Sequence, residues 1–230
     1  MSSKIILTVL AASLTLAMAC KSEIDGKTAA TVGEVQEPAA EQVDEEKTEA
    51  SATSLRQIPV NTEASKIEWY GAKVTGDHKG GFTEWTGTAT VDGENNLKSV
   101  SYEVDMSSVF SDNERLTGHL KSDDFFDIEN HPTSTFESTK IVEGAKGEEE
   151  ATHTVTGNLS LRGVTKELSF PATIKTTDDK LVATSEFKFN RMEFNVAYKG
   201  KADDLIREDV AMTLHFEVPL SEAPAAAAAE

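Results

Sequence analysis

The strongest constraint on the fold is an alternation of apolar and polar side chains that recurs along much of the chain. The clearest run lies near the C-terminus, where every second residue is apolar: Val210, Met212, Leu214, Phe216 and Val218. Similar runs begin at Val100, Val155 and Phe187. Successive side chains of a strand point to opposite faces, so this pattern predicts half-buried β-strands rather than helices.

Further strands are expected at 66–74, 84–92, 135–142, 167–176 and 181–185, with turn signals between them at 92–96, 144–150 and 177–180. Roughly eight antiparallel strands at short spacing predict an all-β domain over residues 56–220, built as a sandwich or as a closed up-and-down barrel.

One segment, 116–136, interrupts this pattern. Residues 111–113 can cap a short helix near 114–121. His131 precedes Pro132 and is therefore expected to have an extended backbone, which ends the helical part of the segment. Phe125 and Phe126 lie between acidic residues. Exposed aromatic surface is unfavourable, so we expect this pair to be covered and the segment to form a lid at one end of the barrel.

The N-terminus has the features of an export signal over residues 1–19. Lys4 precedes a short apolar run, and an Ala-Met-Ala site at 17–19 precedes Cys20, the single cysteine of the chain. Cys20 is either a free thiol at a new N-terminus or a lipidated residue. The sequence at 16–20 resembles a bacterial lipobox, which favours lipidation and a durable membrane anchor. We therefore expect an exported protein in the periplasm, or anchored to the outer membrane of a Gram-negative bacterium as a lipoprotein.

Both ends of the chain have compositions that disfavour folding. Residues 21–54 contain nine acidic residues against three lysines and no aromatic residue, so residues 20–55 are expected to form a disordered acidic tether. The Ala-rich tail at 221–230 is also expected to be disordered. The net charge of −18 disfavours nucleic acid as a partner.

Several motifs occur in a fixed order along the domain. They are IEWYGAK at 67–73, GDHKG at 76–80, LTGHLKSDDFFD at 116–127, HPTSTF at 131–136, VTGNLSLRGVTK at 155–166, and Asn190-Arg191 with Phe194. Together they resemble the YceI-like family of exported bacterial polyisoprenoid-binding proteins. The resemblance implies an extended, eight-stranded antiparallel lipocalin-like barrel with a short helical lid, an elongated apolar pore and no known catalytic centre. This chain departs from the family pattern at His131, where family members commonly have tyrosine, and at Asn195, where they commonly have glycine.

The candidate ligand-binding residues are large apolar side chains of the predicted strands and lid, together with one cation. They are Trp69, Phe82, Trp85, Met106, Phe125, Phe126, Phe136, Phe187, Phe189, Arg191, Phe194 and Leu214, with Phe216 as a further member. Ordinary core packing is the alternative for each one. Small residues on the same strands, such as Gly71 and Gly157, favour unfilled space inside the barrel.

Two functions remain open. The first is a cell-envelope lipid-binding protein that holds an isoprenoid or similar long-chain amphiphile, such as a prenyl phosphate, quinone or fatty amide. Arg191, Arg162 or Lys166 could contact a phosphate or quinone oxygen, with solvent exposure as the alternative for the last two. The second is a non-carrier envelope stress or interaction module with a filled barrel. The five histidines lie on separate segments and indicate no metal site, no catalytic residues stand out, and a homodimer is left open.

Overall fold

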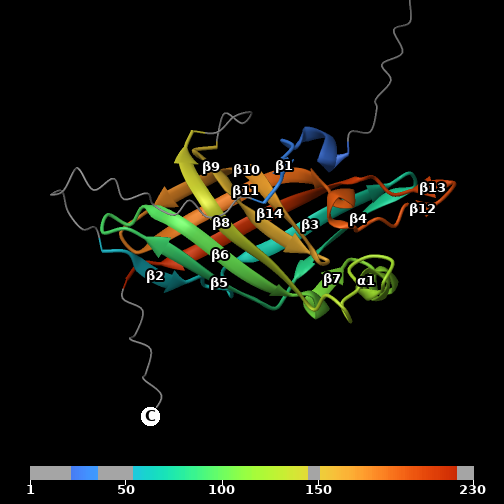
Figure 1. The fold of residues 1–230 in the computed structure, drawn as a ribbon, viewed down its shortest axis with the longest axis horizontal. Helices are drawn as coiled ribbons and strands as arrows, with labels where there is room; N and C mark the ends of the chain where they lie inside the picture. The colour runs from blue at the N-terminus through green and yellow to red at the C-terminus, as the bar shows by residue number, and fades with distance from the viewer. Residues whose placement is uncertain (1–21, 36–53, 145–150, 222–230) are drawn as a thin grey trace, which may run out of the picture.

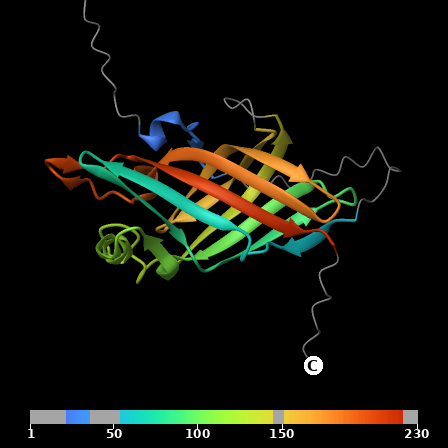
Figure 2. The same ribbon diagram turned by 180° about the vertical axis from the view of Figure 1, so that it is seen from behind.

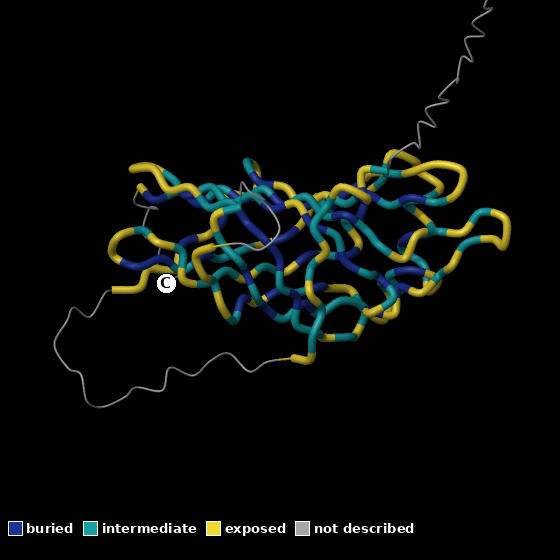
Figure 3. The backbone as a smooth tube through the Cα atoms, turned by 90° about the horizontal axis from the view of Figure 1, so that it is seen from above, coloured by how far each residue is buried: buried dark blue, intermediate teal, exposed yellow. Residues whose placement is uncertain are grey.

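The computed structural model describes residues 22–35, 54–144 and 151–221. These residues form a long antiparallel sheet that curls into a barrel, with the helix α1 (Glu114–Lys121) and a short β12–β13 hairpin at the same end (Figures 1 and 2). Buried residues run along the strands, and exposed ones gather in the loops at the two ends (Figure 3).

The main sheet has the order β2-β5-β6-β8-β9-β10-β11-β14-β3-β4-β7, and β1 pairs with β10. Its strands are β1 (Thr31–Gly33), β2 (Arg56–Pro59), β3 (Lys66–Lys73), β4 (Gly76–Phe82), β5 (Trp85–Val91), β6 (Leu97–Asp105), β7 (Val109–Ser111), β8 (Thr133–Glu143), β9 (His153–Leu161), β10 (Val164–Thr176), β11 (Lys180–Asn190) and β14 (Asp209–Pro219). The hairpin comprises β12 (Gly200–Lys201) and β13 (Asp204–Leu205), and single 3₁₀ turns are η1 (Glu23–Gly26), η2 (Met106–Ser108) and η3 (Arg191–Phe194).

The predicted all-β, lipocalin-like barrel is confirmed, but the count of eight strands is too low. The described part of the main sheet contains twelve strands. Strands β4 and β7 were not expected from the sequence, and β1 and β2 are short additions at the edges. The chain passes from β4 almost directly into β5, and from β6 through the turn η2 into β7, so each of these pairs forms one broken strand. If β4 with β5 and β6 with β7 are each counted as one strand, eight long strands form the barrel. Backbone hydrogen bonds close the barrel, from Asn61 N to the Glu217 carbonyl (2.8 Å) and from Thr83 N to the Ser108 carbonyl (3.4 Å).

The expected helix is present with the expected bounds. The side chain of Asn113 accepts a hydrogen bond from Leu116 N and so caps the first turn. Leu120 and Phe125 are buried in a small cluster with Val109 and Val196, which confirms the lid at this end of the barrel.

The expected disordered tether is wrong for its first part. Residues 22–33, here called the N-terminal strap, lie on the outside of the barrel. Ile24 is only 1% exposed and packs against Tyr70, Ala72 and Ala211, while β1 adds to the edge of β10. One buried isoleucine and backbone pairing are enough to order a polar segment when the barrel supplies an apolar patch. Residues 1–21, with the expected signal peptide and Cys20, lie outside the described residues, as do 36–53 and 222–230.

Candidate functional site

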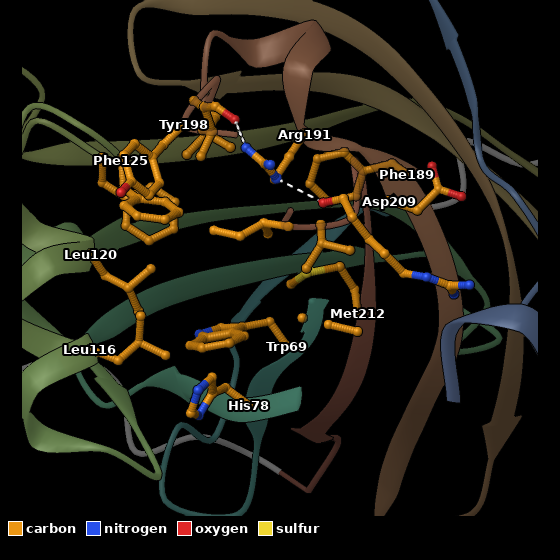
Figure 4. Close-up of a pocket in the computed structure, with 18 of the residues that line it drawn as sticks. Trp69, His78, Leu116, Leu120, Phe125, Phe189, Arg191, Tyr198, Asp209 and Met212 are labelled. Carbon is orange, nitrogen blue, oxygen red and sulfur yellow. Dashed lines mark hydrogen bonds between the residues drawn. The ribbon is translucent and has the colours of Figure 1, made fainter. Parts of the chain in front are cut away.

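A cavity of about 790 Å³ occupies the end of the barrel that carries the lid (Figure 4). This volume lies within the roughly 300–1,000 Å³ typical of small-molecule sites. The cavity follows from the alternation in the sequence, because inward-facing residues of neighbouring strands meet around it. Trp69 on β3 lies opposite Met212 on β14, and Met212 lies opposite Phe187 on β11.

The lid closes part of this end with aromatic side chains. Phe125 contacts the ring of Tyr198 (5.1 Å between centroids) and that of His119 (4.9 Å, edge to face). Phe126 packs against Phe82 at 6.2 Å. All five side chains line the cavity, so the lid and the segment after η3 form its rim.

The opposite end of the barrel is packed. The second cavity, about 40 Å³, lies among side chains such as Phe136, Phe170 and Phe216. The interior is therefore hollow at the lid end and filled at the other.

Arg191 is the one cation buried in the cavity wall among the described residues. It is 7% exposed, its Nε donates to the Arg207 carbonyl (3.0 Å), and its Nη1 donates to the Val196 carbonyl. Nη2 is buried without a hydrogen-bond partner. Burial lowers the pKa of Arg191, and Glu208 partly opposes this effect. A buried guanidinium with a spare donor favours a ligand that presents an oxygen acceptor.

A second hydrogen-bond donor in the cavity wall is also buried and unpaired. The indole Nε1 of Trp69 is buried and has no partner among the described residues. Both unpaired atoms, on Trp69 and Arg191, are donors (Figure 4). Buried donors are costly to leave unpaired, so the cavity suits a mainly apolar molecule with a few acceptor oxygens.

The charges at the rim are mostly paired with each other. Lys73 pairs with Asp204, and this bond lowers the pKa of the Asp204 carboxyl. Arg207 pairs with Asp25 of the N-terminal strap at 2.7 Å. Within the described residues no group of three or more His, Cys, Asp or Glu is arranged to hold a metal ion.

The structure places nine of the twelve candidate residues at this cavity: Trp69, Phe82, Met106, Phe125, Phe126, Phe187, Phe189, Arg191 and Leu214. The other three do not line it. Phe136 lines only the small cavity, Trp85 packs against Phe216 at 5.3 Å, and Phe194 is fully buried behind Phe189. Arg162 and Lys166 also lie elsewhere, since Arg162 donates to the Asn195 and Asp123 carbonyls and Lys166 pairs with Glu193.

Several lining residues were missed from the sequence. Tyr198, Ile206 and Arg207 come from a segment without alternation, so no periodic signal pointed to them. Tyr102 and Val210 lie on alternating runs and on the correct face, and could have been included on that basis.

Comparison with known proteins agrees with this architecture. Residues 42–218 match the model of the YceI-like domain. A UPF0312 protein of Pseudomonas aeruginosa is 37% identical over 97 residues, 42% of this chain and 46% of that protein. A UPF0312 protein of Vibrio parahaemolyticus is 36% identical over 95 residues, 41% of this chain and 48% of that protein. The chain therefore spans about half the length of the curated relatives it matches.

Two solved structures share the fold. BcnA of Burkholderia cenocepacia has a TM-score of 0.60 at 20% identity and covers 69% of this chain and 98% of its own. A domain of Saccharophagus degradans described as polyisoprenoid binding has a TM-score of 0.56 at 13% identity, and covers 74% and 100%. Since the family model covers most of the chain and the barrel agrees with it, this protein belongs to the YceI-like domain family.

Proposed function

We propose that this protein holds an isoprenoid or similar long-chain amphiphile in the cavity, with an oxygen of its head group at Arg191. The observation that carries the proposal is an open-ended apolar cavity of about 790 Å³ whose wall contains a buried guanidinium with an unpaired donor. Each buried CH₂ group contributes roughly 0.8 kcal/mol, so ten of them supply about 8 kcal/mol before the costs of ordering the ligand. The proposal assigns binding and no catalysis to the chain.

The family and one structural neighbour support this class of ligand. The neighbour from Saccharophagus degradans is described as a polyisoprenoid-binding domain. Prenyl phosphates and quinones both combine a long apolar chain with acceptor oxygens. A phosphate would bind through charge and would be weakened by salt, whereas a quinone would be nearly insensitive to it.

The first test is native mass spectrometry of the protein purified from its own envelope, followed by extraction and identification of lipid. We expect a stoichiometric long-chain amphiphile. Protein that carries no lipid, and that binds no added prenyl alcohol or prenyl phosphate, would refute the proposal. That result would favour the non-carrier envelope module instead.

The second test concerns the head group. Arg191→Met removes the buried donor, and we expect at least tenfold weaker binding of a prenyl phosphate, because a charged hydrogen bond contributes about 1.5–3 kcal/mol. Arg56→Met is the matched control, because Arg56 is exposed on β2, contacts Asn95 and does not line the cavity. Equal affinity of both variants would remove Arg191 from the site.

We also propose that the protein is exported and anchored through a lipidated Cys20, in the periplasm or at the outer membrane. Among the described residues, no helix is long and apolar enough to cross a membrane. The strap is fixed to the barrel from Ser22 onward, so at most roughly 7 Å of chain would separate the barrel from the anchored residue. Cys20→Ser should release the protein from the membrane fraction. Unchanged fractionation would count against the anchor.

A further inference from the structure

A chain of stacked aromatic rings crosses the barrel between its hollow and filled ends. Its members, here called the aromatic wall, are Tyr102, Phe136, Phe170, Phe187 and Phe216. Tyr102 stacks on Phe136 at 5.2 Å with 18° between the rings, and Phe170 stacks on Phe187 at 4.4 Å with 12°. Tilted contacts at 5.7 Å (Phe136 with Phe170) and 5.6 Å (Tyr102 with Phe216) connect these pairs.

The aromatic wall crosses the interior on five strands, β14, β6, β8, β10 and β11. Phe216 is on β14 and Tyr102 is on β6, which are not neighbours in the sheet, so their contact spans the inside of the barrel. From Tyr102 the rings continue through Phe136 on β8 and Phe170 on β10 to Phe187 on β11. Phe187 lies opposite Met212 on β14, whereas Phe216 lies opposite Ala183, so the two ends of this chain of rings are at different heights in the barrel.

The two cavities lie on opposite sides of this layer. Phe187 lines the larger cavity, whereas Phe136, Phe170 and Phe216 line the smaller one. Tyr102 lines both. Its side chain therefore stands at the boundary, and burial there raises its pKa.

We infer that the aromatic wall is the floor of the lipid site and sets the length of chain that the protein accepts, with Tyr102 as the residue that sets the limit. The inference rests on the proposed function. Arg191 follows the end of β11, four positions along the chain from Phe187, or about 13 Å of extended backbone, so a chain held at Arg191 meets the floor after a short run and must then fold back. At roughly 30 Å³ per heavy atom, the volume share of a liquid water molecule, 790 Å³ holds about 26 atoms or five isoprene units.

The site therefore selects prenyl chains of up to about five units rather than long polyisoprenoids that extend through the whole barrel. Additional units would remain in water beyond the rim and add little affinity. Each unit that still fits should tighten binding at least tenfold, since burial of two carbon groups already has that effect.

The test measures the affinity of prenyl alcohols of three to eight isoprene units by isothermal titration or by displacement of a fluorescent fatty-acid probe. For the wild type we expect affinity to rise and then level off near five units. Tyr102→Ala removes six ring carbons and a hydroxyl, room for about one isoprene unit, so it should move the plateau by one unit and tighten binding of the first excluded alcohol at least tenfold.

Two variants serve as controls. Tyr102→Phe keeps the ring and should keep the wild-type plateau. Phe194→Leu changes a fully buried aromatic that lines neither cavity and should also leave the plateau in place. If Tyr102→Ala fails to fold by circular dichroism, Phe187→Leu opens the same layer from the hollow side.

The outcomes separate the two ideas. A wild type that binds neither a prenyl alcohol nor a prenyl phosphate overturns the proposed function and the inference with it. A wild type that binds with steadily rising affinity up to eight units, or a folded Tyr102→Ala whose plateau does not move, overturns the floor alone.

Discussion

Replacing Ile24 with alanine should detach the N-terminal strap while the barrel stays folded. Ile24 is the one buried apolar side chain of η1, and it fills a patch formed by Tyr70, Ala72 and Ala211. The rest of the attachment comprises three residue pairs between β1 and β10, backbone hydrogen bonds of Thr28 and Ala30 with Lys188 on β11, partial packing of Ala30 and Val32 against the main core, and partly exposed ion pairs such as Arg207–Asp25. Exposed ion pairs add only about 0–1 kcal/mol each, so the isoleucine carries a large share of the free energy.

The magnitude follows from the burial of Ile24. Truncation of a buried isoleucine to alanine costs about 2–5 kcal/mol. The lower half of this range applies here, because the strap can move away from the patch. A loss of about 2–3 kcal/mol raises the population of the open strap about 30- to 150-fold.

Hydrogen exchange followed by mass spectrometry measures this population. Peptides covering residues 22–33 should exchange about 30- to 150-fold faster in Ile24→Ala, while peptides from β8 and β14 should keep their wild-type rates. Val35→Ala is the matched control, because Val35 follows just after the strap and is 50% exposed. Unchanged exchange in the strap, or equal acceleration in the strap and the central strands, would refute the reasoning.

Two further predictions concern stability. In urea titrations, Gly118→Ala should raise the free energy of unfolding by about 0.5–1 kcal/mol, because the added methyl group on α1 meets open space. Gly80→Ala should lower the free energy of unfolding by about 1–3 kcal/mol, because its methyl group overlaps the Phe110 carbonyl and the Trp69 ring. Hydrogen bonds from Lys98, and then from Asn96 and Glu94, hold the pKa of Asp92 well below its usual range. The stability that Asp92 contributes is therefore present above the unfolded-state pKa of about 3.9 and is lost as pH falls below it. The Tm of Asp92→Asn should be lower than that of the wild type at pH 7 and should fall less between pH 5 and pH 2. If the Tm of the variant falls in parallel with that of the wild type, this assignment is wrong.

The strand framework could be predicted because each strand is half buried. The run from Val210 to Val218 predicts β14 to within a residue, and Asn113 predicts the start of α1. Within that framework, alternation says which side chains face inward. It does not say whether the space they face is filled, which is why Trp85 and Phe136 were expected at the cavity and are found in the packed core.

The strap and the rim could not be predicted for a related reason. Ile24 is a lone apolar residue in a polar stretch, and its burial depends on a patch that exists only once β3 and β14 are paired. Arg207 and Tyr198 reach the cavity through the irregular segment between η3 and β14, where position depends on tertiary contacts. Local pattern carries no information on such contacts.

The division of the barrel into two halves has a consequence for the empty protein. A void forfeits the dispersion contacts of its lining, so the lid end gains little from folding until something fills it. At the opposite end Leu181, Val91 and Val218 are fully enclosed and keep their contacts whatever the other half contains. An empty molecule therefore retains a solid half that preserves the strand order, and a ligand of the proposed class would enter or leave without unfolding the barrel.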